Sequence, residues 1–346
     1  MPEVQLSLLP EGRGQLQDIY TRICLLQYCL LFPVLSMKIL LQFPEGLKQK
    51  ALEHARKLES EGNEVFISAS PTYGACDLAI DEAKRIGAEK LVHFGHAEFH
   101  HVDFNVEYVD YKIDAPLSIL GRSLPALENF RKIGLVTTVQ HIHQLDEIKM
   151  FYEKNGKEVV IGRPYGFAKT NGQILGCDIG SAASIDRSVD AHVYFGGGIF
   201  HPIGALLSTS KPFLVIDPFH GNIEFIDHYR ESYRKKSNGR IAASVEAKRF
   251  GIIVSTKNGQ YNLNLAKILK NRIEASGLEA AILVSNNIDF DSLNNMREFD
   301  AFVNTACPRI AIDDTERLRK PLLSANELMK ALEFMRESRE RVAERE

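Results

Sequence analysis

Three stretches of the chain open in the same way, and this repetition constrains the fold more than any other feature. Each stretch begins with a basic residue, continues as a β-rich apolar run, and leads through a turn into a helix-like segment. The opening runs are residues 38–43, 132–136 and 249–254. A second run follows a glycine in every unit, at residues 62–67, 156–161 and 277–284. A third run completes each unit, at residues 90–94, 191–195 and 300–304.

The order strand, helix, strand, helix, strand predicts a small parallel sheet covered by helices on both faces. The chain has 346 residues, and at roughly 150 residues per domain this length predicts two to three domains. We therefore expect three similar α/β domains, each a small parallel sheet flanked by helices. Their predicted ranges are 37–128, 129–245 and 246–346, the last ending in a charged helix over 327–346 with Leu328, Leu332 and Met335 on one face.

An apolar segment precedes the repeats, within a predicted N-terminal extension over residues 1–36. Its core, residues 23–35, contains Gln27 and Pro33 and is shorter than the roughly 20 residues that cross a bilayer. The first residues also lack the basic start and small-residue cleavage site of a signal peptide. We expect a helix that packs on the body of the protein or at a dimer contact, with Cys24 and Cys29 in its core, and no membrane partner.

Charge and cysteine content narrow the classes of partner and compartment. Lys and Arg number 42 against 45 Asp and Glu, a formal net charge of −3, so no basic excess is present to bind a nucleic-acid backbone. Five widely spaced cysteines form an odd set that suits reduced thiols better than a secreted disulfide framework. A cytoplasmic protein without a nucleic-acid partner is predicted.

One cysteine stands in each predicted unit. Cys76 and Cys177 each follow the second strand of their unit, whereas Cys307 follows the third strand of its own. An inert buried thiol is the ordinary state of a lone cysteine. If the three converge, soft thiolates select zinc, copper(I) or an iron–sulfur cluster. A cubane cluster held by three cysteines leaves one iron without a protein ligand, and that iron can bind a small molecule.

Seven short motifs, taken together and in order, resemble those of the archaeal diphthamide synthase radical enzymes, which act in the first step of diphthamide biosynthesis. The similarity covers about residues 37 to 325, and its motifs lie at residues 73–77, 95–96, 137–145, 176–177, 198–202, 216–218 and 306–309. Ala97 departs from the pattern, in which serine is expected after the glycine and histidine at 95–96. A hydrogen bond assigned to that serine hydroxyl has no counterpart here.

The resemblance implies a noncanonical radical enzyme whose three domains surround a central cluster site. In such an enzyme Cys76, Cys177 and Cys307 hold a [4Fe–4S] cluster, and the open iron engages S-adenosylmethionine. The usual C-x3-C-x2-C signature of radical enzymes is absent from the sequence. The family breaks the sulfonium–Cγ bond and adds the resulting 3-amino-3-carboxypropyl radical to the imidazole C2 of a histidine on translation elongation factor 2. An unidentified electron donor and a homodimer are further implications.

Polar residues at predicted strand ends are candidates to bind S-adenosylmethionine, because ligands collect at the carboxyl ends of parallel strands. These candidates are Gln140, His143, His201, Asp217, Ser255 and Gln260.

Two rival functions remain at the level of sequence. A quinolinate-synthase-like [4Fe–4S] dehydratase also joins three α/β domains around three cysteines but condenses its substrates without S-adenosylmethionine. A structural scaffold would instead hold zinc at the three thiolates with a fourth ligand. Formation of methylthioadenosine separates the first rival from the radical enzyme, and iron and sulfide analysis separates the second.

Overall fold

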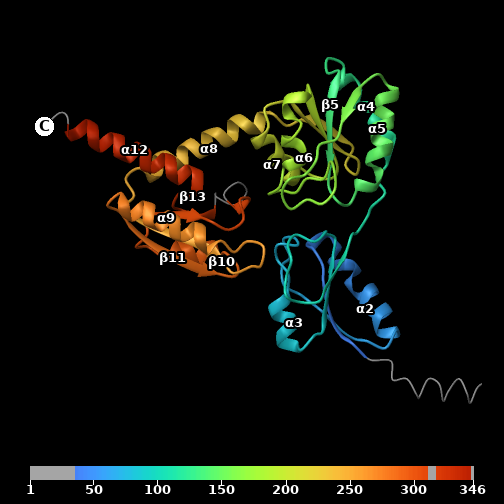
Figure 1. The fold of residues 1–346 in the computed structure, drawn as a ribbon, viewed down its shortest axis with the longest axis horizontal. Helices are drawn as coiled ribbons and strands as arrows, with labels where there is room; N and C mark the ends of the chain where they lie inside the picture. Colours follow the sequence, from blue (N-terminus) through green and yellow to red (C-terminus); the bar gives the residue numbers. More distant parts are fainter. Residues whose placement is uncertain (1–35, 311–316, 344–346) are drawn as a thin grey trace, which may run out of the picture.

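Three α/β units form the protein (Figure 1). The computed structural model describes residues 36–310 and 317–343, so the predicted N-terminal helix, with Cys24 and Cys29, lies outside the described residues. The three sheets have the strand orders β2-β1-β3-β4, β6-β5-β7-β8-β9 and β11-β10-β12-β13. All strand pairs are parallel except β8 with β9. The predicted fold class, three similar units with small mostly parallel sheets and flanking helices, is confirmed.

The first unit contains β1 (Lys38–Gln42), η1 (Glu45–Lys50), α2 (Ala51–Ser60), β2 (Glu64–Ile67), α3 (Ile80–Ile86), β3 (Lys90–Phe94) and β4 (Val106–Val109). The second contains η2 (Leu117–Ile119), α4 (Leu120–Ser123), η3 (Pro125–Leu127), β5 (Lys132–Thr137), η4 (Ile142–Gln144), α5 (Leu145–Lys154), β6 (Glu158–Val160), α6 (Gly180–Ala183), η5 (Asp186–Ser188), β7 (Ala191–Phe195), α7 (Phe200–Ser208), β8 (Phe213–Asp217) and β9 (Asn222–Phe225). Helix α8 (His228–Ser244) leads to the third unit, which contains β10 (Arg249–Ser255), α9 (Leu263–Ala275), β11 (Glu279–Ser285), α10 (Phe290–Asn295), β12 (Ala301–Asn304), β13 (Leu322–Ser324) and α12 (Ala325–Ala343).

The same local chemistry builds the first half of every unit. A glycine with positive φ ends the turn before the second strand: Gly62 (φ 90°), Gly156 (φ 80°) and Gly277 (φ 74°). Glycine adopts this left-handed conformation without the strain that a Cβ atom brings. An acidic side chain just before the third strand then accepts backbone N–H groups at the start of the first strand, and Asp190 and Asp300 each accept two such bonds. The repeat is thus encoded by turn and capping residues as well as by apolar runs.

The central strand of each sheet is buried on both faces, as expected for parallel sheets that are covered by helices. Successive residues of one strand point to opposite faces, so Leu40 and Leu41 of β1 join different hydrophobic clusters. In the third unit Ile252 of β10 packs beneath α9 and α12, and the adjacent Ile253 packs against α10 on the other face. The runs are therefore almost continuously apolar instead of alternating.

The fourth strands were not predicted. Strands β4, β8 and β13 extend the three sheets at one edge, and β9 turns back antiparallel on β8. They contain three to five residues each and lie beyond the strand, helix, strand, helix, strand pattern from which the three units were predicted. The predicted C-terminal helix is confirmed: α12 buries Leu328, Leu332 and Met335.

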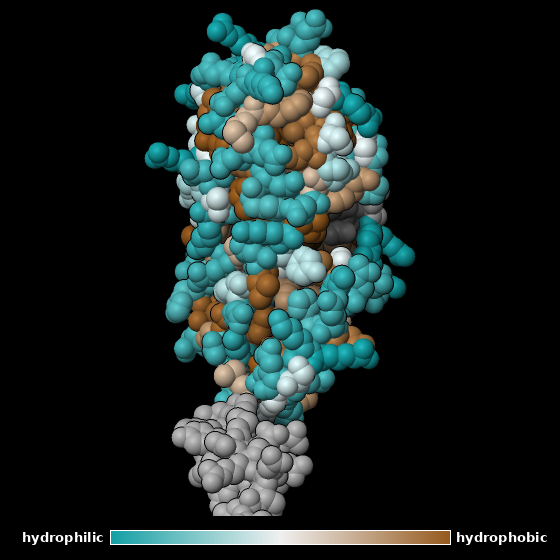
Figure 2. Space-filling view, turned by 90° about the vertical axis from the view of Figure 1, so that its right-hand side faces the viewer, coloured by the Kyte–Doolittle hydropathy of each residue, from teal (hydrophilic) through white to brown (hydrophobic). Residues whose placement is uncertain are grey.

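The surface carries mainly polar side chains on the side viewed in Figure 2, with hydrophobic residues scattered between them. Across the residues that the structure describes, helices long and apolar enough to cross a membrane are absent. Helix α8 packs against α7 of the second unit and against α12 and β13 of the third, so it joins these two units.

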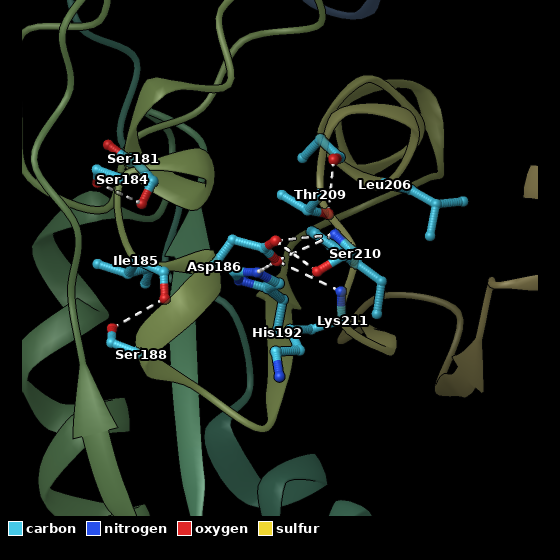
Figure 3. Close-up of polar contacts among 12 residues, drawn as sticks. Ser181, Ser184, Ile185, Asp186, Ser188, His192, Leu206, Thr209, Ser210 and Lys211 are labelled. Carbon is cyan, nitrogen blue, oxygen red and sulfur yellow. Dashed lines mark hydrogen bonds and ion pairs between the residues drawn. The ribbon is translucent and has the colours of Figure 1, made fainter.

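A partly buried polar network lies in the second unit, where Asp186 lies between His192 and the turn at Ser210 and Lys211 (Figure 3). The carboxylate accepts from the backbone N–H groups of Ser210 and Lys211, from the Ser210 hydroxyl at 2.7 Å, and from His192 Nε2 at 3.0 Å. His192 itself is fully buried. It fits there because β5 has Gly134 at this point, where a Cβ atom would stand 2.8 Å from His192 Nδ1.

Replacing Asp186 with alanine leaves these donors without their acceptor. We expect the free energy of unfolding to fall by about 1–2 kcal/mol, because the buried His192 loses its acceptor while the exposed Ser210 can bond to water. Urea denaturation of the Asp186→Ala protein measures the loss. The matched control is Glu147→Ala at an exposed position of α5, which should change stability by less than about 0.5 kcal/mol. Equal effects of the two substitutions would show that the network contributes nothing.

Candidate metal centre

A cavity of about 450 Å³ lies where the three units meet, and Cys76, Cys177 and Cys307 all line it. Cys76 belongs to the loop between β2 and α3, Cys177 to the loop between β6 and α6, and Cys307 to the loop after β12. The loops with Cys76 and Cys177 follow β2 and β6, which lie on one side of the central strands β1 and β5. The loop with Cys307 follows β12, which lies on the other side of its central strand β10. The cavity therefore brings together three residues that are distant in sequence.

Burial and neighbouring thiols raise the pKa values of Cys76 and Cys177. Burial is the largest cause at Cys76, where the Cys307 thiol adds to the upward shift and a hydrogen bond from Gln260 opposes it. Burial raises the pKa of Cys177 to about 12, with smaller contributions from Cys307 and Cys76. Although Cys177 is exposed to the cavity, protein surrounds it otherwise. Three thiolates here require a positive group between them, and a bound metal supplies that charge.

The donor set suits a cluster of several irons. Within residues 36–310 and 317–343, groups of three or more Cys, His, Asp or Glu close enough to hold one metal ion are absent. Ligands of a single zinc ion, each about 2.3 Å from the metal, crowd around one point. In an iron–sulfur cubane each thiolate binds its own iron, so three cysteines spread around a cavity fit this larger group.

A loop of the third unit holds the Cys76 loop of the first. The Gly259 N–H donates to the Cys76 carbonyl at 2.9 Å, and Gln260 Nε2 donates to Cys76 Sγ at 3.5 Å. A Cβ atom on Gly259 would stand 2.6 Å from Cys76 Cα, so only glycine allows this approach. The position of Cys76 therefore depends on docking of the third unit.

An ion pair buried beside this loop reinforces the docking. Lys257 Nζ lies 2.6 Å from Asp77 Oδ1, and the two side chains are only 7% and 10% exposed. Lys257 also lies over the ring of Tyr73, 5.5 Å from its centroid. Because Asp77 follows Cys76 directly in the chain, the ion pair fixes the neighbourhood of a candidate ligand.

A second cationic side chain joins the third unit to the second. Arg309, two residues after Cys307, is buried and lies over the ring of Phe200 in α7, with its guanidinium carbon 4.3 Å from the ring centroid. Both residues line the cavity. The Arg309 guanidinium therefore forms part of the cavity wall.

Histidines form another part of the wall. His96 and His201 line the cavity, and His93 lies behind His96, with His93 Nε2 and His96 Nδ1 3.0 Å apart. Burial lowers the pKa of His93 to about 3 and the pKa values of His96 and His201 to about 4. All three imidazoles are therefore neutral at pH 7.

Two of the six polar candidates predicted to bind S-adenosylmethionine, His201 and Gln260, line this cavity. Gln140 lies outside the lining and donates through Nε2 to the Gly95 carbonyl at 2.9 Å. His143 also lies outside and pairs with the exposed Asp114 at 2.7 Å.

The remaining two candidates serve their own loops. Asp217 accepts backbone N–H bonds from Gly198, Phe219 and His220, which with a hydrogen bond from the His220 ring lower its pKa to about 2 against the opposing effect of burial. The Ser255 hydroxyl accepts from the Lys257 N–H at 3.2 Å. These contacts arrange the loops at the strand ends.

Sequence reasoning missed three cavity residues, His96, Lys257 and Arg309, as candidates for ligand binding. His96 and Arg309 stand inside motifs already singled out at 95–96 and 306–309, so a signal was present. Lys257 offered only its place after the first strand of the third unit. Its partner Asp77 is far away in the chain, and only the fold brings them together.

The fold and this site define a class of protein in which repeated α/β units share one three-cysteine cavity. The chain belongs to the diphthamide synthesis family: the family described as "putative diphthamide synthesis protein" matches residues 43–343.

Curated relatives agree with this assignment. The chain is 37% identical over 297 residues to the 2-(3-amino-3-carboxypropyl)histidine synthase of Pyrococcus horikoshii, covering 85% of each protein. It is 31% identical to subunit 1 of the human enzyme of that name, covering 86% of this chain and 68% of the human protein.

Solved structures are similar over nearly the whole chain. The crystal structure of Dph2 from Pyrococcus horikoshii matches with a TM-score of 0.80 and 35% identity, covering 89% of both chains. The structure of the same protein with a 4Fe-4S cluster matches with a TM-score of 0.78 and 34% identity, covering 90% of both. A protein of this fold thus holds the kind of cluster that the cavity fits.

Replacing Lys257 with methionine leaves the buried Asp77 carboxylate without its counter-charge. We expect Lys257→Met to lower the free energy of unfolding by about 3–5 kcal/mol, measured by urea denaturation of the apo protein. Adding Asp77→Asn to the same chain should recover part of the loss, because the stranded charge is gone. Lys149→Met is the matched control, since Lys149 pairs with Glu153 at the surface and such pairs contribute less than about 1 kcal/mol. Additive effects at 257 and 77 would contradict a direct coupling.

Acid should destabilise the apo protein before its carboxylates titrate. Unfolded histidine takes up a proton near pH 6.5, whereas folded His93 and His201 stay neutral until about pH 3 and 4. The unfolded chain therefore binds more protons in this window, and the free energy of unfolding falls as pH decreases. Urea denaturation between about pH 6.5 and about 5 measures the slope.

The variant His201→Phe should show a shallower fall, because one titrating group is removed. His101→Phe, at an exposed position, should keep the wild-type slope. Wild-type stability that stays constant across this pH range would show that the buried imidazoles are not neutral.

Proposed function

We propose that this protein transfers the 3-amino-3-carboxypropyl group of S-adenosylmethionine to a histidine of translation elongation factor 2, the first step of diphthamide biosynthesis. The observation that carries the proposal is the meeting of Cys76, Cys177 and Cys307, one from each unit, in a single cavity. The relative from Pyrococcus horikoshii whose name describes this product and the neighbouring structure with a 4Fe-4S cluster support it.

Cys76, Cys177 and Cys307 are the proposed ligands of a [4Fe–4S] cluster. When bound and reduced, such a cluster supplies one electron that cleaves the sulfonium–Cγ bond of S-adenosylmethionine aligned with its open iron. The protein's contribution is orientation, because the bond that breaks is the one held toward the iron. Electrons come from a donor that remains to be identified.

The cavity wall can orient an amino-acid group. Its volume of about 450 Å³ is within the range of small-molecule sites. Arg309 presents N–H donors to a carboxylate, and the neutral His201 and the amide of Gln260 offer hydrogen bonds. The walls near Phe200 and Tyr73 are apolar and aromatic and suit an adenine or the methionine chain.

The protein substrate has to reach this cavity from outside. Tyr73 is 66% exposed and Phe200 is 46% exposed, although both line the cavity. The site is therefore open to solvent on an aromatic rim, as a reaction on another protein requires. We further propose that the enzyme works in the cytoplasm, which suits its odd set of widely spaced cysteines. A homodimer is proposed from the family resemblance.

The cysteine assignment predicts a sharp contrast between two sets of variants. Replacing Cys76, Cys177 or Cys307 with alanine should abolish transfer, because each removes one of three ligands. Cys24→Ala and Cys29→Ala are matched controls that should keep most of the activity. Transfer is measured by mass spectrometry of elongation factor 2 after anaerobic reconstitution, together with iron and sulfide content and the visible spectrum. Full activity of Cys177→Ala would contradict the ligand set.

The same reconstituted protein tests the reaction class. With dithionite and S-adenosylmethionine it should release methylthioadenosine, because cleavage at Cγ leaves that fragment. Methylthioadenosine at the background level of the Cys177→Ala protein would reject the proposed cleavage. Bound zinc without iron would instead favour a structural scaffold.

A further inference from the structure

A chain of buried polar side chains leads from strand β1 to the cavity. Gln42 is the last residue of β1, His93 lies in β3, and His96 follows β3 in the loop that lines the cavity. Gln42 Oε1 lies 2.9 Å from His93 Nδ1, and His93 Nε2 lies 3.0 Å from His96 Nδ1. Gln42 and His93 are almost wholly inaccessible to solvent.

The orientation of the Gln42 amide is fixed by its other partners. Its Nε2 donates to the Asp77 carbonyl at 2.7 Å and to Thr72 Oγ1 at 3.3 Å. Its Oε1 accepts from the Ala79 N–H at 3.1 Å. Turning the amide over would place its oxygen against the Asp77 carbonyl and its NH₂ group against the Ala79 N–H. An amide oxygen only accepts hydrogen bonds, so His93 Nδ1 carries the hydrogen that faces it.

The tautomer of His93 determines the tautomer of His96. Burial keeps His93 neutral, so with the hydrogen on Nδ1 its Nε2 is a bare acceptor. The hydrogen between the two rings must then belong to His96 Nδ1. Because burial also keeps His96 neutral, its Nε2 has no hydrogen.

The bare nitrogen lies on the cavity wall, on the side of the Cys76 loop. His96 Nε2 and Cys76 Sγ stand 3.9 Å and 3.7 Å from the point that a Cβ atom on Gly74 would occupy. Lys257 and Arg309 of the wall present only N–H donors, whereas the Glu98 carboxylate and the lining amides also carry acceptor oxygens. His96 Nε2 differs from these acceptors because the buried chain behind it fixes its position and its tautomer.

We propose that the Gln42–His93–His96 chain fixes a hydrogen-bond acceptor, His96 Nε2, that receives an ammonium N–H of the ligand bound in the cavity. This assignment rests on the proposed function, in which the ligand is S-adenosylmethionine and the donor is its α-ammonium group. The N–H donors of Arg309 on the same wall then suit the α-carboxylate. Gln42 and His93 are positioning residues, since they act through His96.

The tautomer can be measured on the apo protein without any ligand. Long-range proton–nitrogen NMR of histidine-labelled protein at neutral pH distinguishes bare from hydrogen-bearing ring nitrogens, and the signals of His96 are assigned by their loss in His96→Phe. We expect hydrogen on Nδ1 and none on Nε2. In His93→Phe, where the acceptor is gone, the His96 signals should move toward a mixture of tautomers. Hydrogen on His96 Nε2 in the wild type overturns the inference.

The ligand is tested by binding to the reconstituted, oxidised protein under anaerobic conditions. Isothermal titration calorimetry compares S-adenosylmethionine with an analogue that lacks the amino group. The wild type should bind the analogue about 10- to 100-fold more weakly, as expected for loss of a hydrogen bond to a charged group. In His96→Phe both molecules should bind with similar affinity. The control His101→Phe should keep the wild-type preference.

The two proposals fail in different ways. If the wild type binds S-adenosylmethionine and His96→Phe keeps its full preference for the amino group, the role of His96 is overturned while the proposed function stands. If the reconstituted wild type does not bind S-adenosylmethionine at all, the proposed function and the ligand assignment fall together. The NMR result then still decides whether the chain fixes the acceptor.

Discussion

The contact between the third unit and the Cys76 loop is the constraint on which the site depends. A buried ion pair, a backbone hydrogen bond and the missing side chain of Gly259 all act within a few residues there. Each of these is short-ranged, so a small displacement of the unit would lose all of them together. The wall containing Cys76 is therefore fixed by residues that follow it by about half the chain.

The spacing of residues was sufficient to predict the units but not their meeting, which only the family resemblance implied. Apolar runs, turn glycines such as Gly62 and Gly156, and the positions of the cysteines are local features, and local features carry a periodic signal. The edge strands β4 and β13 lie outside the strand, helix, strand, helix, strand pattern that the three units share. Whether three thiols converge depends on how the units dock, and the spacing of residues along the chain carries no information about docking.

Prediction of the individual ligand contacts had a similar limit. Strand-end polarity selected His201 and Gln260, which line the cavity, and also Asp217 and His143, whose hydrogen bonds lie within their own surroundings. Strand ends carry two kinds of polar residue, those that hold loops and those that face ligands, and composition does not separate them. Lys257 shows the reverse case, because its role depends on the ion pair with Asp77, which belongs to another unit.

The distribution of the three cysteines over three units also orders events during biosynthesis. Chains emerge from the ribosome N-terminal end first, and domains fold largely as they emerge. Cys76 and Cys177 are then synthesised before the third unit, which carries Cys307 and the residues that hold the Cys76 loop. A truncated or arrested chain would present only two of the three proposed ligands, with the Cys76 loop not yet held, so the proposed cluster site is complete only in a finished molecule.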